Sequence, residues 1–131
     1  MRYEATITFT QEEKTIKEQI IVEDCELFAE VEAKLYEKEK GYEDVDVTAI
    51  KRSKIKEIAN ERTSDDEKIF LATLVDIFLN DDGSEKEMKY TIAFFSKTMD
   101  SAHAYISQYA SQGYCMAVTK IVESKFVDVL K

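Results

Sequence analysis

Two Ser–Lys pairs, Ser53–Lys54 and Ser124–Lys125, have the residue types that come closest to nucleophilic chemistry in this chain. A lysine is activated for such chemistry when a buried pocket lowers the pKa of its ammonium group. Adjacent residues of a strand point to opposite faces, so the two members of one pair do not form a dyad with each other. We interpret the pairs as structural, with the lysine stems covering apolar surface. The functional alternative is that both pairs bind an anion.

His103 is the only histidine, and Cys25 and Cys115 are the only cysteines. A zinc site draws three or four ligands from His, Cys and carboxylate side chains, and the sequence has no paired-ligand spacing. We therefore expect no metal and no cofactor, and free, partly buried thiols. His103 is expected to be half-buried on the apolar stripe of a helix.

The segment Asn80–Gly83 faintly resembles part of a calcium loop. With Gly83 in the glycine position of such a loop, the first ligand position falls on Phe78 and the final glutamate position on Lys89. The sequence thus excludes an EF-hand and predicts a β-turn. It also contains no phosphate-binding loop, dinucleotide fingerprint or nucleophile elbow. We predict no catalytic residues and no enzymatic activity.

Aromatic residues are concentrated in the second half of the chain, where most of them are expected in the core. Tyr109 and Tyr114 have polar tips, so they are also candidates for an interface or for a pocket that binds a planar ligand. The concentration comprises Tyr90, Phe94, Phe95, Tyr105, Tyr109 and Tyr114.

The composition predicts one globular domain, because 131 residues with 44% hydrophobic content suffice for a core. A formal charge of −9 argues against a nucleic-acid partner, since such proteins need a basic face. No apolar run is long enough for a membrane helix, and no signal peptide is evident. We expect a cytoplasmic location and no membrane association.

An internal repeat organises the sequence. Val47–Ile58 recurs as Val118–Val129, at a spacing of 71 residues from Val47 to Val118. Each copy is preceded by two strand-like segments and an amphipathic helical segment, which predicts strand–strand–helix–strand in each half. Within the repeated segment the apolar phase slips, and either a bulge or a change from strand to short helix would explain the slip.

The ends of the predicted helices follow from capping signals. Asp24 is a candidate N-cap for the first helix, and either Ser96 or Thr98 for the second. Gly41 and Gly113 each follow a helical segment, where a glycine accepts the positive φ that often ends a helix.

Both repeated segments share a Val/Ile-Thr-x-Ile-x-x-Ser/Thr-Lys-Ile/Phe-x-Glu/Asp-Ile/Val pattern, and the second helix opens with Ser96–Ala102. With the closing segment Ile121–Val129, these features resemble a family of small uncharacterised proteins from Bacteroides-type bacteria and their phages and mobile elements. The resemblance covers most of the chain, although Lys51–Arg52 and Glu26–Glu39 are more charged than the family pattern. Because the family has no assigned activity, the resemblance assigns no catalytic residues.

We predict an α+β fold of two tandem strand–strand–helix–strand repeats with pseudo-twofold symmetry and mainly antiparallel sheet. The single domain comprises repeat 1 (1–60) and repeat 2 (68–131), joined by a polar link (59–68).

The predicted function is that of a small, non-catalytic interaction protein, encoded by a phage or mobile element as the resemblance implies. Its acidic surface suits a basic host protein. The segment Ile69–Leu79 is apolar on both faces, which predicts a homodimer through repeat 2. The alternative is a binder of an anionic small molecule such as a nucleotide, held between halves or subunits, contacted by Lys54 and Lys125 and stacked on a tyrosine.

Overall fold

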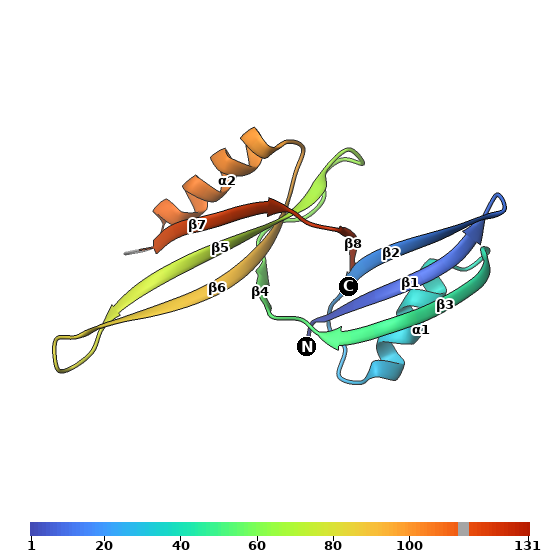
Figure 1. Ribbon diagram of the computed structural model, residues 1–131, viewed down its shortest axis with the longest axis horizontal. Helices are drawn as coiled ribbons and strands as arrows, with labels where there is room; N and C mark the ends of the chain where they lie inside the picture. Colours follow the sequence, from blue (N-terminus) through green and yellow to red (C-terminus); the bar gives the residue numbers. More distant parts are fainter. Residues whose placement is uncertain (113–115) are drawn as a thin grey trace. The chain divides into compact units, whose positions relative to one another are not determined.

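The computed structural model describes residues 1–112 and 116–131, which form two four-stranded sheets and two helices (Figure 1). The fold is α+β with mostly antiparallel strands, as the sequence predicts. The chain divides into two compact units. Unit 1 comprises residues 1–53 and 125–131, and unit 2 comprises residues 54–124.

Unit 1 has the strand order β3-β1-β2-β8, in which β1 is antiparallel to β2 and β3, and β8 is parallel to β2. The chain returns through the helix to place β3 beside β1. The elements are β1 (Tyr3–Gln11), β2 (Lys14–Val22), α1 (Phe28–Lys38), β3 (Glu43–Arg52) and β8 (Phe126–Leu130).

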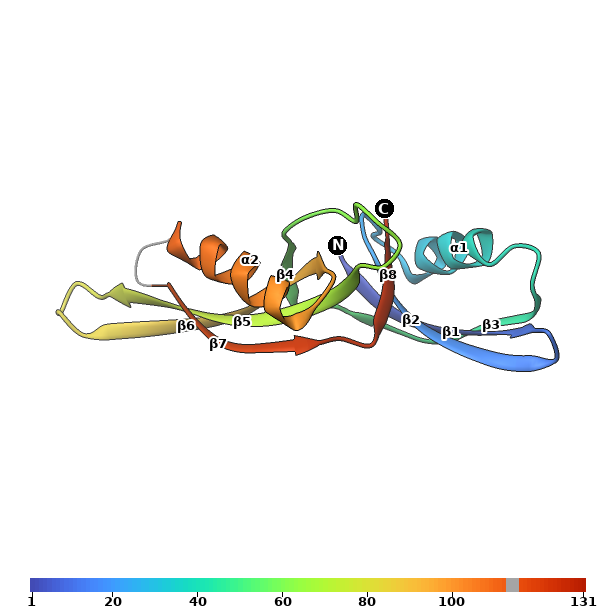
Figure 2. The ribbon, with the colours of Figure 1, turned by 90° about the horizontal axis from the view of Figure 1, so that it is seen from above.

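The core of unit 1 lies between its sheet and α1, which covers one face of the sheet (Figure 2). Alternate residues of β1 point into this core, and Val31 and Leu35 form the buried stripe of α1. At the far end of the sheet, the ring of the buried Phe9 packs against Tyr42, with 4.6 Å between the ring centroids. Cys25 is a buried free thiol.

Unit 2 has the strand order β4-β6-β5-β7, in which β5 is antiparallel to β6 and β7, and β4 is parallel to β6. The described residues of its core lie between the sheet and α2, where Phe70, Leu74, Ile92 and Phe94 meet Ile106 (Figure 2). The elements are β4 (Ile55–Ile58), β5 (Lys68–Leu79), β6 (Glu85–Ser96), α2 (Met99–Ser111) and β7 (Met116–Glu123).

The repeated segments form two strands each, so the expected strand–strand–helix–strand order is one strand short in both halves. The first segment breaks after β3 at Ser53–Lys54 and continues as β4, and the second breaks after β7 at Ser124–Lys125 and continues as β8. The slip in apolar phase therefore marks a break at which the chain leaves one sheet for the other. Local periodicity does not reveal this, because the new partners β6 and β2 are distant in sequence.

The sequence places His103 and Asp24 incorrectly. His103 is exposed, because the buried stripe of α2 is the narrow row Ala102, Ile106 and Ala110. Asp24 is not the N-cap of α1; it lies in a turn at φ 58°, and Leu27 occupies the N-cap position without a side-chain bond.

The remaining capping expectations have mixed outcomes. Thr98 is the N-cap of α2 and forms a capping box with Ser101, so the second of the two alternatives is correct. Gly41 follows α1 with φ +103°, as a glycine beyond a helix end does. Gly113 lies outside the described residues.

Shortening Ile106 tests the assigned core of unit 2. Ile106 is fully buried, so Ile106→Ala should lower the free energy of unfolding by about 2–5 kcal/mol, because it removes buried methyl groups and leaves a cavity. Urea denaturation followed by circular dichroism measures this. His103→Ala on the same helix is the control and should change the free energy by less than about 0.5 kcal/mol; a comparable loss in both variants would contradict the packing described here.

Candidate functional site

The Ser–Lys pairs lie at the strand breaks, with Ser53 and Lys125 in unit 1 and Lys54 and Ser124 in unit 2. Both lysines are exposed. The backbone N–H of Ser53 donates to the Arg2 carbonyl at 2.9 Å. The backbone N–H and the Oγ of Ser124 both donate to the Ile69 carbonyl, at 2.9 and 2.7 Å. These bonds fix the ends of β3 and β7, and the Ser124 hydroxyl is directed to the backbone.

Tyr109 belongs to a tyrosine cluster in unit 2, formed by Tyr90, Tyr105 and Tyr109 with Lys56 and Glu57. The Tyr109 hydroxyl donates to Glu57 Oε2 at 2.6 Å. The Tyr105 hydroxyl donates to the backbone carbonyl of Ala59, just after β4, at 3.3 Å. Lys56 Nζ lies 4.1 Å from the centroid of the Tyr90 ring. The cluster therefore ties α2 to the edge strand β4 and to β6.

The tyrosine hydroxyls of the cluster are hydrogen-bond donors at neutral pH. Burial raises the pKa of Tyr109, and the hydrogen bond to the Glu57 carboxylate raises it further. Burial, with the Glu57 charge in addition, also raises the pKa of Tyr105, and burial with the Asp76 charge raises that of Tyr90. Chemistry that needs a tyrosinate is therefore disfavoured here, and donation to an acceptor is favoured.

A pocket of about 350 Å³ lies beside the cluster. Two glutamine amides and two tyrosine rings give it a polar and aromatic lining, which suits a planar ligand with hydrogen-bonding groups. Neither Lys54 nor Lys125 lines it, and Tyr114 and Cys115 lie outside the described residues. The lining residues are Ala59, Tyr105, Gln108, Tyr109 and Gln112.

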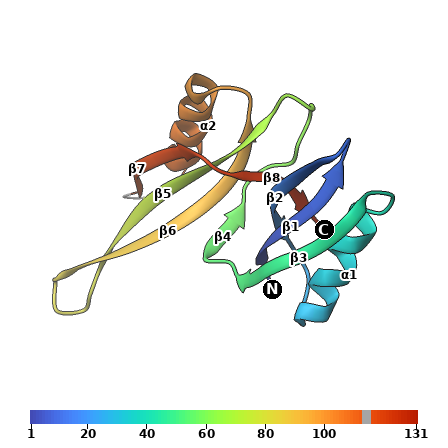
Figure 3. The ribbon, with the colours of Figure 1, turned by 45° about the vertical axis from the view of Figure 1, so that its right-hand side comes forward.

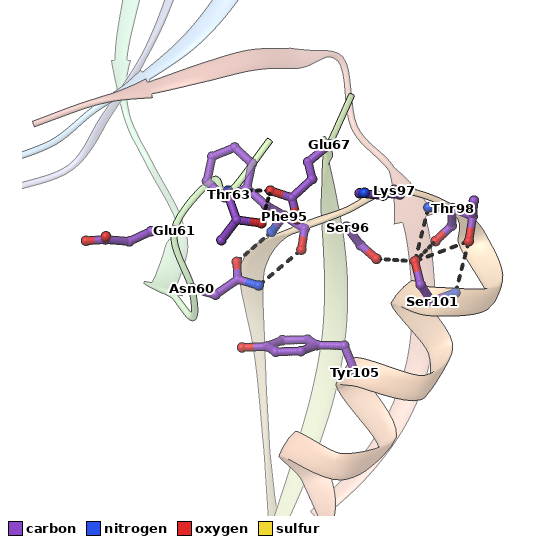
Figure 4. A pocket seen from close by; sticks show the side chains of 10 residues that line it. All are labelled: Asn60, Glu61, Thr63, Glu67, Phe95, Ser96, Lys97, Thr98, Ser101 and Tyr105. Carbon is purple, nitrogen blue, oxygen red and sulfur yellow. Dashed lines mark hydrogen bonds between the residues drawn. The ribbon is translucent and has the colours of Figure 1, made fainter. Parts of the chain in front are cut away.

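A larger pocket, of about 690 Å³, lies where the polar link meets the end of β6 and the start of α2 (Figure 4). The Asn60 side chain clamps the backbone of Phe95: its Nδ2 donates to the carbonyl at 3.0 Å, and its Oδ1 accepts from the N–H at 2.7 Å. Asn60 thus continues the pairing of β4 with β6 through a side chain. The lining residues are Asn60, Glu61, Thr63, Glu67, Phe95, Ser96, Lys97, Thr98, Ser101 and Tyr105.

The polar groups of this larger pocket bond mainly to one another. Glu67 accepts bonds from Thr63 and from the Ser64 N–H, and the bond from the Thr63 backbone is the main reason that the pKa of Glu67 is lowered. The Ser101 hydroxyl is engaged by the N-cap of α2 (Figure 4). Among the described residues, every buried side-chain nitrogen and oxygen has a hydrogen-bond partner. Hydrogen bonds between its own residues therefore fix the conformation of the link at this end of the sheet.

Sequence reasoning missed Glu57, Lys56 and Asn60. A regular strand would send Lys56 and Glu57 to opposite faces, but the pairing of β4 with β6 shifts between Ile55 and Glu57. The extra residue changes the direction of the side chains, so that both reach the tyrosine cluster. The one available signal was the charged strand end ahead of the link.

Neither helix in the described parts of the chain has the length and apolar character needed to cross a bilayer. The architecture is that of a small α+β protein with a helix on one face of each sheet. The family model described as Domain of unknown function (DUF4494) matches residues 1–131, and the chain belongs to this family. The sequence resemblance to an uncharacterised family is confirmed to that extent. No curated protein and no solved structure gives a significant match.

Removing the Tyr109 hydroxyl should destabilise the protein in a pH-dependent way. At pH 7, Tyr109→Phe loses the bond to Glu57 and should cost about 1 kcal/mol of unfolding free energy. The pKa of Tyr109 is raised in the folded state, so the unfolded chain releases this proton first as the pH rises above 10. The wild-type advantage should therefore shrink above pH 10.

Urea denaturation at pH 7 and above pH 10 measures this difference. Tyr36→Phe, at an exposed tyrosine of α1, is the control and should match the wild type at both pH values. A Tyr109→Phe deficit that grows above pH 10 would contradict the assigned hydrogen bond.

Proposed function

We propose that this chain is a small, non-catalytic cytoplasmic interaction protein that forms a homodimer through unit 2. The observation that carries the proposal is a group of exposed apolar side chains at the end of the β5–β6 hairpin. Ile77, Phe78, Leu79 and Met88 are 37, 48, 76 and 50% exposed. Such a group on one hairpin is typical of an interaction surface.

Among the described residues, the hairpin end has few neighbours within unit 2. β7 pairs with β5 only from Phe70 to Asp76, and β4 pairs with β6 only from Thr91 to Ala93. Figures 1 and 3 show the hairpin running on beyond β7 and α2. We call its end, Ile77–Leu79 with Glu85–Lys89, the ribbon. A two-stranded ribbon is marginally stable alone, so a partner that covers its apolar side chains stabilises it.

The predicted two-sided apolar character of β5 supports the same proposal. Near its start, residues of both faces, such as Ile69 and Phe70, are buried. Near its end, Ile77 and Phe78 alternate in the same way but are exposed. The strand is thus apolar beyond the length that the described residues of unit 2 cover. The formal charge of −9 on the whole chain also makes a basic host protein a candidate partner.

Truncating the apolar side chains of the ribbon tests the proposal. Light scattering should give the wild type twice the 15.1 kDa chain mass. Phe78→Ser combined with Leu79→Ser should give a single chain mass, because the apolar area that drives association is lost. Leu27→Ser, at a residue 63% exposed in unit 1, is the control and should leave the dimer intact. A wild type that remains at one chain mass at every concentration would refute the homodimer.

We also propose that the two halves are tandem copies related by pseudo-twofold symmetry, in a protein of phage or mobile-element origin. The halves share the order strand–strand–helix–strand–strand, and each sheet has one parallel edge strand. The matching segments Val47–Ile58 and Val118–Val129 both break at a Ser–Lys pair. The repeat boundaries at residues 60 and 68 remain a prediction.

A second candidate function is binding of a small planar ligand at the pocket beside the tyrosine cluster, with a nucleotide as the anionic example. Its aromatic and amide lining favours this candidate. Titration with ATP in a calorimeter should show saturable binding that Tyr109→Ala abolishes and Tyr36→Ala preserves. Lys54→Ala and Lys125→Ala test whether these lysines contact the phosphates. Absence of saturable heat in the wild type would eliminate this candidate.

A further inference from the structure

We propose that the outer edge of β6, from Lys86 to Tyr90, pairs antiparallel with the same segment of a second copy, with Met88 of one chain opposite Met88 of the other. We call this segment the β6 edge. The inference rests on the proposed homodimer and specifies its contact: two unit 2 sheets joined edge to edge.

The other edges of the two sheets are irregular. The pairings of the outer strands β3, β8, β4 and β7 with their inner neighbours all contain register shifts, and each outer strand has an extra residue there. Such bulges twist an edge and hinder pairing with another chain. The β1–β2 and β5–β6 ladders have no shift. The regular edges are therefore the parts of these hairpins that no outer strand covers among the described residues.

Two stretches of five residues meet this description, and Ile77–Leu79 of β5, beyond its pairing with β7, is a shorter one. One is Lys14–Glu18 of β2, because β8 pairs with β2 only from Gln19, and the other is the β6 edge, because β4 pairs with β6 only from Thr91. Beside the β2 stretch Phe9 is buried, and Ile16 within the stretch is half-buried. Beside the β6 edge, Phe78 is 48% exposed and Met88 is 50% exposed. Of the two five-residue edges, the β6 edge is thus the one that lies beside exposed apolar side chains.

The charges of the β6 edge complement those of a second copy. A twofold axis perpendicular to the sheet keeps each side chain on its own face. With Met88 on this axis, Glu87 of each chain lies opposite Lys89 of the other, which gives two opposite-charge pairs.

The other twofold registers are less favourable. Centring the pairing on Lys86 places Glu85 opposite Glu87 twice, and centring it on Glu87 or Lys89 places that residue opposite itself. Directly opposed like charges are destabilising. The Met88-centred register is the one among these four without such a pair. It also brings Phe78, a diagonal neighbour of Met88 on the same face, to the joined surface.

Charge reversal tests this register. Glu87→Lys places a lysine opposite Lys89 of the other chain in both pairs, and Lys89→Glu places a glutamate opposite Glu87 in both pairs. Each variant should therefore weaken dimerisation at least about tenfold in sedimentation equilibrium. An equimolar mixture of the two variants should dimerise like the wild type, because both mixed pairs are again opposite in charge. The double variant with both reversals should also form a homodimer.

Lys17→Glu, at the corresponding β2 stretch, is the control and should leave the dimer intact. Circular dichroism verifies that each variant is folded, and restoration in the mixture cannot arise from two misfolded chains. If neither single reversal weakens the dimer, or if the mixture stays monomeric, the register is wrong. Loss of the dimer only on truncation of Phe78 and Leu79 would keep the proposed function and overturn this edge pairing, whereas a monomeric wild type overturns both.

Discussion

Parallel pairing between strands that are distant in sequence is the constraint on which both units depend. β8 completes the unit 1 sheet by pairing with β2, and β4 completes the unit 2 sheet by pairing with β6. In both cases the chain leaves one ladder at a Ser–Lys pair and enters another within two residues. Consequently neither half of the sequence contains all the strands of one unit, and each sheet is closed by a strand that the other half supplies. The serine N–H bonds at these breaks fix the ends of β3 and β7.

The site residues depend on the same arrangement. β4 brings Glu57 to Tyr109 and Lys56 to the Tyr90 ring, so the tyrosine cluster exists only because a strand that follows β3 in the chain pairs with β6. Asn60 then extends that pairing by a side-chain clamp on Phe95. The polar groups around the cluster and around the link already form these hydrogen bonds. The tyrosines therefore act as hydrogen-bond donors that hold the edge strand β4 in place.

Local patterns predicted the elements that local forces decide. The strand-like segments ahead of each repeated segment, the amphipathic helices and Thr98 as one of two candidate caps all follow from sidedness or from neighbouring backbone bonds. The α+β class and the mainly antiparallel pairing followed from them. The fourth strand of each half did not, because its direction is set by a partner far away in sequence. Even less of the site could be predicted from the sequence. Glu57 faces the cluster because of a bulge, and the periodicity of apolar residues does not reveal this bulge.

The pairing of β2 with β8 also sets the order in which the protein can mature on the ribosome. β1, β2, α1 and β3 are complete once residue 52 has been made, yet their sheet lacks its fourth strand until residues 126–130 emerge. Unit 2, which spans residues 54–124, is synthesised within that interval. During translation, at about 5–20 residues per second, the β2 edge therefore stays open for several seconds. The strand that closes the sheet made first is therefore translated only after all of unit 2.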